Sequence, residues 1–131
     1  MRYFLAIVFT LLANISVAQD REIQSVIRDQ IEAFRADDFA EAFEHASPGI
    51  RQLFGSSQRF GQMVQQGYPM VQRPSGLTFL EQRNDGGLIW QRLLLRDAQG
   101  RGHVLDYQMI QTKNGWKING VQLLPSADPS A

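Results

Sequence analysis

Side chains that could act as acid–base or metal-binding groups are few in this chain of 131 residues. His45 and His103 are its two histidines, and they lack the short spacing of a metal-binding pair. There is no cysteine, which excludes disulfides, thiolate chemistry and a lipid-modified cysteine. The sequence therefore predicts neither a metal site nor a cofactor site.

Asp106 is the strongest candidate for a general acid–base group. His103 lies three residues before it, and residues three apart on a strand point to opposite faces of the sheet. The two side chains would meet only if a bulge lay between them, and no glycine marks one. Asp106 alone could act as a general base if it were buried and its pKa raised. The alternative is a structural carboxylate on a half-exposed strand, so no catalytic residue is assigned.

A second group of side chains is suited to binding rather than to catalysis. Tyr68, Trp90 and Tyr107 each combine a large apolar ring with a polar tip, and Arg92 adds a charged donor. These four residues are the predicted ligand-binding site, for a small apolar or anionic molecule. The alternative is structural: both Trp90 and Tyr107 would be core, and Arg92 would pair with Glu81 on the neighbouring strand.

The first 18 residues have the pattern of a cleavable signal peptide. Arg2 supplies positive charge, an apolar run follows from 3 to 15, and small residues end at Ala18. A retained membrane anchor is the alternative, but a spanning helix needs roughly 20 apolar residues. We expect cleavage after Ala18, a periplasmic or secreted protein, and no membrane contact after cleavage.

The charge of the chain argues against a nucleic-acid partner. Lysine and arginine together number 13, as do aspartate and glutamate, so the formal net charge is +0. A nucleic-acid backbone is recognised through a basic surplus, which this chain lacks.

Hydrophobic spacing predicts helices first and strands afterwards. Apolar residues recur at helical spacing over 20–36, and polar caps with a glycine or proline delimit three shorter helices. From residue 77 the period changes to two, with turn dipeptides between the runs. The expected elements are helices over 20–36, 38–46, 48–54 and 57–67, a connector over 68–74, and strands over 77–84, 88–96, 103–113 and 116–124.

This order predicts an α+β domain over 19–124, in which N-terminal helices pack on a curved four-stranded antiparallel meander. A bulge is expected at Asn119 and Gly120, since glycine within a strand commonly marks one. Residues 125–131 are expected to form a disordered tail.

Turn positions also suggest a strand register. Trp90 would lie opposite both Arg83 and Tyr107, while Arg92 would lie opposite Glu81 and Leu94 opposite Phe79. One sheet face would then carry Phe79, Trp90, Leu94, Tyr107, Met109, Val121 and Leu123. A shift of one residue would reverse these faces.

Several strings of the chain resemble a family of exported bacterial proteins called domain of unknown function 4864. They are His45-Ala46-Ser47-Pro48, Phe54-Gly55, Gly67-Tyr68-Pro69-Met70-Val71, Trp90-Gln91-Arg92, His103 to Tyr107, and Gly115-Trp116-Lys117-Ile118. The resemblance covers residues 22 to 124, and the family name carries no activity. The order of elements also resembles the wider cystatin-like, or nuclear-transport-factor-like, cone fold. That resemblance implies a concave sheet crossed by a helix, which often leaves a pocket.

Three functions remain open at this point. The first is an exported, non-catalytic domain that binds a small molecule in the cone. The second is a protein-interaction module, such as a homodimer formed through the sheet, and the third is an enzyme that uses Asp106 or a histidine. A fold of this kind hosts all three classes, so it does not choose among them.

Overall fold

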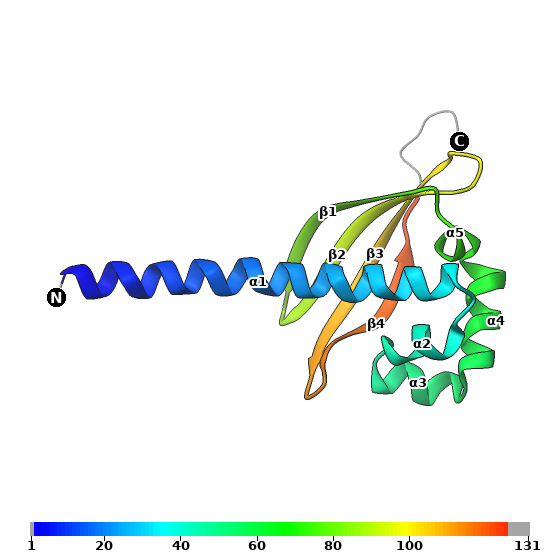
Figure 1. The fold of residues 1–131 in the computed structure, drawn as a ribbon, viewed down its shortest axis with the longest axis horizontal. Helices are drawn as coiled ribbons and strands as arrows, with labels where there is room; N and C mark the ends of the chain where they lie inside the picture. Colours follow the sequence, from blue (N-terminus) through cyan, green and yellow to red (C-terminus); the bar gives the residue numbers. More distant parts are fainter. Residues whose placement is uncertain (1, 126–131) are drawn as a thin grey trace.

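A computed structural model describes residues 2–125 of the chain, with side chains from Val17 onward. It confirms an α+β fold in which helices precede a four-stranded antiparallel sheet of order β1-β2-β3-β4 (Figure 1). The elements are α1 (Arg2–Arg35), α2 (Phe39–Glu44), α3 (Pro48–Phe54), α4 (Ser57–Gly67), α5 (Pro69–Gln72), β1 (Gly76–Asp85), β2 (Leu88–Arg96), β3 (Gly102–Thr112) and β4 (Gly115–Leu123). The predicted tail lies outside the described residues except for Pro125.

The long helix α1 crosses one face of the sheet (Figure 1). Its buried stripe is Ile23, Ile27, Ile31 and Phe34, which follows the helical spacing seen in the sequence. The helix includes residues 20–35 of the predicted 20–36 segment and also continues back to Arg2. Among the described residues, no helix is both long enough and apolar enough to cross a membrane.

The ends of the short helices follow the polar caps in the sequence. Asp38, Ser47 and Ser56 each accept a hydrogen bond from the first turn of α2, α3 and α4, respectively. The prediction of a connector over 68–74 was wrong in one part, because residues 69–72 form α5. Pro69 occupies the first helical turn, where its missing N–H costs nothing.

The predicted register was right at the first hairpin and wrong further along. Arg83 lies opposite Trp90 as expected, but Trp90 faces Gln108 rather than Tyr107. The predicted register assumed that the β2–β3 turn closes with Arg96 opposite Arg101, whereas the structure pairs Arg96 with Gly102, one residue further on. This shift of one residue moves β2 side chains to the other face relative to β3.

A bulge in β1 accounts for the other register error. The pairing jumps from Phe79–Leu93 to Gln82–Gln91, so Glu81 is not opposite Arg92 and Leu94 is not opposite Phe79. Gln91 is fully buried and donates to the Leu80 carbonyl oxygen over 3.0 Å, and it accepts a hydrogen bond from Gln82 over 2.8 Å. The buried amide therefore pairs the backbone oxygen that the bulge leaves without a ladder partner.

The two faces of the sheet consequently differ from the prediction. Ile89, Gln91, Leu93 and Leu95 of β2 are buried on the face that the helices cover, which we call the inner face. Trp90, Arg92 and Leu94 alternate with them and lie on the opposite, outer face.

The segment between α2 and α3 is bonded to β4. The Ser47 N–H donates to the Ile118 carbonyl oxygen over 2.8 Å, and the Ile118 N–H donates to the His45 carbonyl oxygen over 2.9 Å. Ser47 Oγ also donates to Asn119 Oδ1 over 2.7 Å. Asn119 is the extra residue of the predicted β4 bulge, which the pairing confirms. We call this joint, formed by His45–Ser47 and Ile118–Asn119, the β4 clamp.

Ser47 caps α3 and also takes part in the clamp, which gives a test by substitution. Ser47→Ala removes a cap and leaves Asn119 Oδ1 without its buried donor, so it should lower the free energy of unfolding by about 1–2 kcal/mol. Ser56→Ala removes only an exposed cap and should cost about 0.5–1 kcal/mol. Urea unfolding of both variants measures the difference, and equal losses would show that the clamp adds nothing beyond capping.

A cavity between the helices and the inner sheet face

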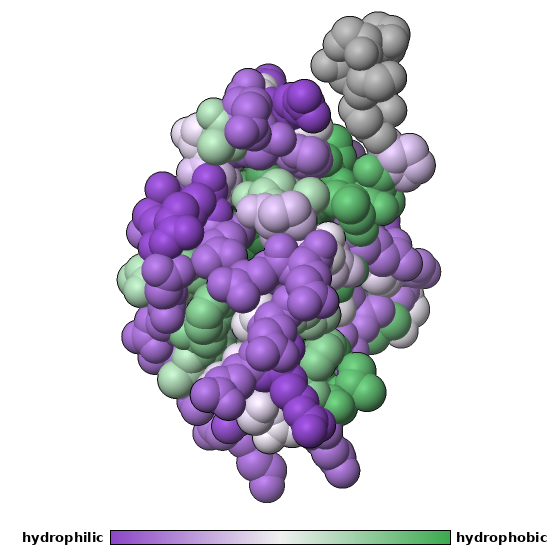
Figure 2. All heavy atoms as spheres, turned by 90° about the vertical axis from the view of Figure 1, so that its right-hand side faces the viewer, coloured by the Kyte–Doolittle hydropathy of each residue, from purple (hydrophilic) through white to green (hydrophobic). Residues whose placement is uncertain are grey.

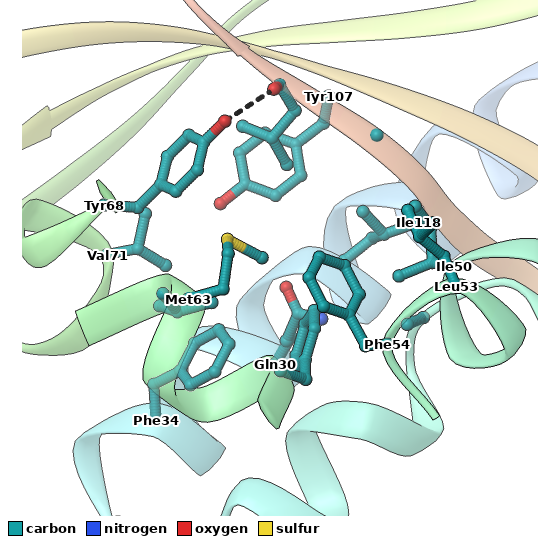
Figure 3. Close-up of a pocket in the computed structure, with 15 residues that line it drawn as sticks. Gln30, Phe34, Ile50, Leu53, Phe54, Met63, Tyr68, Val71, Tyr107 and Ile118 are labelled. Carbon is teal, nitrogen blue, oxygen red and sulfur yellow. Dashed lines mark hydrogen bonds between the residues drawn. The ribbon is translucent and has the colours of Figure 1, made fainter. Parts of the chain in front are cut away.

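An apolar cavity of about 260 Å³ lies between the short helices, α1 and the inner face of the sheet (Figure 3). Every helix from α3 to α5 contributes to its wall, as do β3 and β4. Its lining residues are Gln30, Phe34, Ala46, Ile50, Leu53, Phe54, Phe60, Met63, Val64, Tyr68, Val71, Tyr107, Ile118, Gly120 and Val121. Ligand sites in proteins typically measure 300–1,000 Å³, so this one suits a small molecule.

Aromatic rings stiffen one wall of the cavity. Phe60 stacks on Phe34 with ring centroids 5.9 Å apart, and it meets Phe54 edge-on at 5.7 Å. Such contacts hold rings in fixed orientations and add to the stability gained from burial. The cavity is therefore bounded on this side by a packed cluster.

Helix α3 lies at the mouth of the cavity. Leu53 lines the cavity and is nevertheless 74% exposed, and α3 contains no fully buried residue. The surface over the short helices is mostly hydrophilic with small hydrophobic patches (Figure 2). A route from solvent into the cavity thus passes beside α3.

Tyr107 places an unpaired polar group in this apolar space. Its hydroxyl points into the cavity (Figure 3), is fully buried, and has no hydrogen-bond partner among the described residues. Burial raises the pKa of Tyr107 well above its ordinary value, and the nearby Tyr68 adds to the shift. The phenol is therefore neutral and serves as a hydrogen-bond donor rather than as a base. A buried donor without a partner typically costs about 1–3 kcal/mol, which makes the position notable.

Two further polar side chains line the cavity, and each donates a hydrogen bond to a backbone carbonyl oxygen. Tyr68 donates its hydroxyl to the Val121 carbonyl oxygen over 3.3 Å. Gln30 donates Nε2 to the Ala42 carbonyl oxygen over 3.1 Å, which turns its side-chain oxygen toward the cavity (Figure 3). Both residues therefore present an oxygen that can accept a hydrogen bond.

The structure brings together two of the four predicted ligand-binding residues. Tyr68 and Tyr107 line the cavity, whereas Trp90 and Arg92 lie on the outer face of the sheet. The separation follows from the β2–β3 register, which places Gln91 rather than Trp90 opposite Tyr107.

Asp106 also lies on the outer face, where it is buried beneath two arginines. Its Oδ2 accepts hydrogen bonds from Arg83 Nη2 at 2.8 Å and Arg92 Nη2 at 3.2 Å. Arg83 in turn lies over the Trp90 ring, and its hydrogen bond to Asp106 raises the pKa of its guanidinium. Arg92 also approaches Glu81, with 3.6 Å between Nε and Oε1, so the expected ion pair forms despite the wrong register. Asp106 is thus the centre of an ion-pair cluster and does not face the cavity.

The histidines are engaged elsewhere. His45 Nε2 lies 3.2 Å from Glu41 Oε1 on α2, and His103 Nε2 lies 2.9 Å from Asp97 Oδ2 at the β2–β3 turn. The hydrogen bond from His103 lowers the pKa of the Asp97 carboxyl, and backbone N–H groups of the turn contribute to the shift. No group of three or more potential metal ligands occurs in the part of the chain that the structure describes.

Gln30 lines the cavity but was not among the predicted ligand-binding residues. It falls on the apolar stripe of α1, three residues after Ile27 and four before Phe34, and it is only 3% exposed. A single amide on an otherwise apolar helix face could have indicated this position, because a buried polar group requires hydrogen-bond partners. The contribution of α3 to the cavity could not be predicted in this way, since that helix has no fully buried side chain.

The family model described as Domain of unknown function (DUF4864) matches residues 16–131. The chain belongs to this family. Neither a curated protein nor a solved structure matches the chain. The family resemblance predicted from the motifs is thereby confirmed, while the wider cone-fold resemblance stays a prediction.

Several of the strings on which the family resemblance was based have a structural role in this protein. His45-Ala46-Ser47-Pro48 forms the helix side of the β4 clamp, and Trp116 and Ile118 of β4 belong to the core. Tyr68 and Pro69 join α4 to α5 beside the cavity. Much of the motif content therefore shapes the cavity and its frame.

Removing the Tyr107 hydroxyl should not weaken the fold. Tyr107→Phe deletes a buried donor that has no partner among the described residues, so the free energy of unfolding should rise by about 1 kcal/mol. Tyr68→Phe is the matched control, because it deletes a hydroxyl that is hydrogen-bonded and should cost roughly 0.5–1 kcal/mol. Thermal and urea unfolding compare the two, and a loss at Tyr107 as large as at Tyr68 would show that this hydroxyl is paired.

Proposed function

We propose that this protein is an exported, non-catalytic domain that binds a small, mainly apolar molecule in the cavity between its helices and its sheet. The observation that carries the proposal is the buried, unpaired Tyr107 hydroxyl inside an apolar cavity. A purely structural core would gain stability from phenylalanine at this position. A polar group kept at a cost to stability is a common mark of a binding site.

The positions of the acid–base side chains support a binding role over a catalytic one. Asp106, His45 and His103 were the candidates for catalysis, and none of them lines the cavity. Asp106 is held by two arginines on the outer face. Tyr107, which lines the cavity, is kept neutral by its raised pKa.

The proposal of export rests on the first 18 residues and agrees with the packing of α1. Among the residues with described side chains, Ile23 is the first that is buried, while Val17 is half exposed. A cut after Ala18 would therefore leave the packed part of the domain intact.

Export can be tested by mass. The full-length chain, expressed in a Gram-negative bacterium, should be recovered from the periplasm or the medium with an intact mass lower by residues 1–18. A protein that stays in the cytoplasm, or that keeps these residues while bound to membranes, would contradict export with cleavage.

A second function, protein interaction through the sheet, is favoured by a separate observation. The outer face carries partly exposed apolar side chains, namely Trp90, Leu94, Val104 and Ile110. Apolar surface gathered on one face of a soluble domain commonly marks a contact site. The ion-pair cluster around Asp106 divides this surface, which makes it less apolar than the cavity.

Native mass spectrometry of the exported protein separates the two functions. We expect a monomer that carries additional small-molecule mass. Val121→Phe, which places a ring in the cavity, should abolish that mass. Val104→Phe is the matched control, because Val104 is partly exposed on the outer face, and it should retain the bound molecule.

The contrary result is equally specific. The contrary observation is an unliganded dimer or a complex with a co-purifying protein. If this species disappears in Val104→Phe but persists in Val121→Phe, the binding function is excluded and the interaction function is supported.

A further inference from the structure

The polar side chains of the cavity offer a ligand both a hydrogen-bond donor and hydrogen-bond acceptors. Tyr107 supplies a hydroxyl whose hydrogen has no acceptor among the described residues. Gln30 and Tyr68 supply oxygens, since the Tyr68 hydroxyl hydrogen and one of the two Gln30 Nε2 hydrogens are bound to the carbonyl oxygens of Val121 and Ala42. A ligand that satisfies this set must accept one hydrogen bond from Tyr107 and donate one to Gln30 or Tyr68.

Charge narrows the ligand class further. Of the residues that line the cavity in the described part of the chain, none is an aspartate, glutamate, lysine, arginine or histidine. Transfer of an unpaired carboxylate or ammonium group into such an apolar space is strongly unfavourable. The raised pKa of Tyr107 is consistent with a site that resists charge.

The size of the cavity limits the apolar part of the ligand. An apolar cavity of roughly 150 Å³ holds benzene, so a space of about 260 Å³ has room for a somewhat larger ring or a medium-length alkyl chain. The aromatic wall of Phe34, Phe54 and Phe60 offers contact along the length of such a group.

From this arrangement we infer that the cavity selects an uncharged alcohol or phenol, whose hydroxyl accepts from Tyr107 and donates to Gln30 or Tyr68 while its hydrocarbon part fills the apolar space. This inference rests on the proposed binding function and specifies its ligand class. A hydroxyl is the smallest neutral group that both donates and accepts. An ether or a ketone would leave the oxygens of Gln30 and Tyr68 unpaired, and a carboxylate would add charge as well.

Four probes of matched chain length test the inference: nonane, heptyl methyl ether, 1-octanol and octanoate. Each is titrated at neutral pH into the exported protein from which bound molecules have been removed, and binding is followed by the amide NMR signals of cavity residues. We expect 1-octanol to bind at least about tenfold more tightly than octanoate, because burial of the carboxylate charge is unfavourable. It should bind about three- to tenfold more tightly than the ether, because one hydrogen bond contributes about 1 kcal/mol.

Tyr107→Phe supplies the second measurement. The variant should bind 1-octanol about three- to tenfold more weakly than the unmodified protein does. Its affinity for nonane should stay within about twofold, since nonane makes no hydrogen bond to the hydroxyl. Unfolding curves of the variant show independently that its fold is retained.

The failures of the two proposals are distinguishable. If octanoate binds most tightly, or if Tyr107→Phe changes the affinities for 1-octanol and nonane equally, the alcohol inference is wrong while the binding function stands. If none of the four probes shifts the signals of cavity residues at concentrations near their solubility, both the inference and the binding function fail.

Discussion

The joint between the helices and the last strand is the constraint on which the rest of the cavity depends. Backbone hydrogen bonds join Ser47 and His45 to Ile118, and the Ser47 side chain both caps α3 and donates to Asn119. The joint fixes the start of α3 against the β4 bulge, so Ile50, Leu53 and Phe54 extend over the inner sheet face. Without it, α3 would be held mainly by partly exposed contacts, since none of its residues is fully buried. A few directional bonds thus position a wall that hydrophobic packing alone would leave loose.

The sheet divides the polar chemistry of the protein into two regions with different roles. On the outer face, the buried Asp106 carboxylate pairs with Arg83 and Arg92, and this pairing offsets the cost of removing its charge from water. On the inner face, Gln91 forms hydrogen bonds at the β1 bulge, and both its side-chain nitrogen and its side-chain oxygen have partners. The cavity differs from both regions, because none of its described lining residues is charged and the Tyr107 hydroxyl is buried among apolar side chains without a hydrogen-bond partner in the described part of the chain. This contrast separates a polar group that supports the fold from one available to a ligand.

Much of the fold could be predicted from local signals. Caps at Asp38, Ser47 and Ser56, the apolar stripe of α1, and the turn dipeptides between strands are each read over a few residues. The helix α5 was missed because four residues that begin with proline carry too little periodicity to distinguish a helical turn from a connector. Two of the three polar residues of the cavity were also predictable, since Tyr68 and Tyr107 were recognised by residue type. Trp90 and Arg92 were grouped with them because an assumed turn closure differed by one residue from the observed one.

The sequence by itself determined the α+β order, the membership of the family, the lack of cysteine chemistry and the stripe that packs α1 on the sheet. Only the tertiary structure decided which face of each strand the helices cover, because side chains alternate with a period of two and a single-residue shift exchanges the faces. It also decided that Gln30, Tyr68 and Tyr107 meet in one cavity, although 77 positions separate the first from the last. Encounters over such separations depend on register, bulges and helix placement together, and no local pattern encodes that combination.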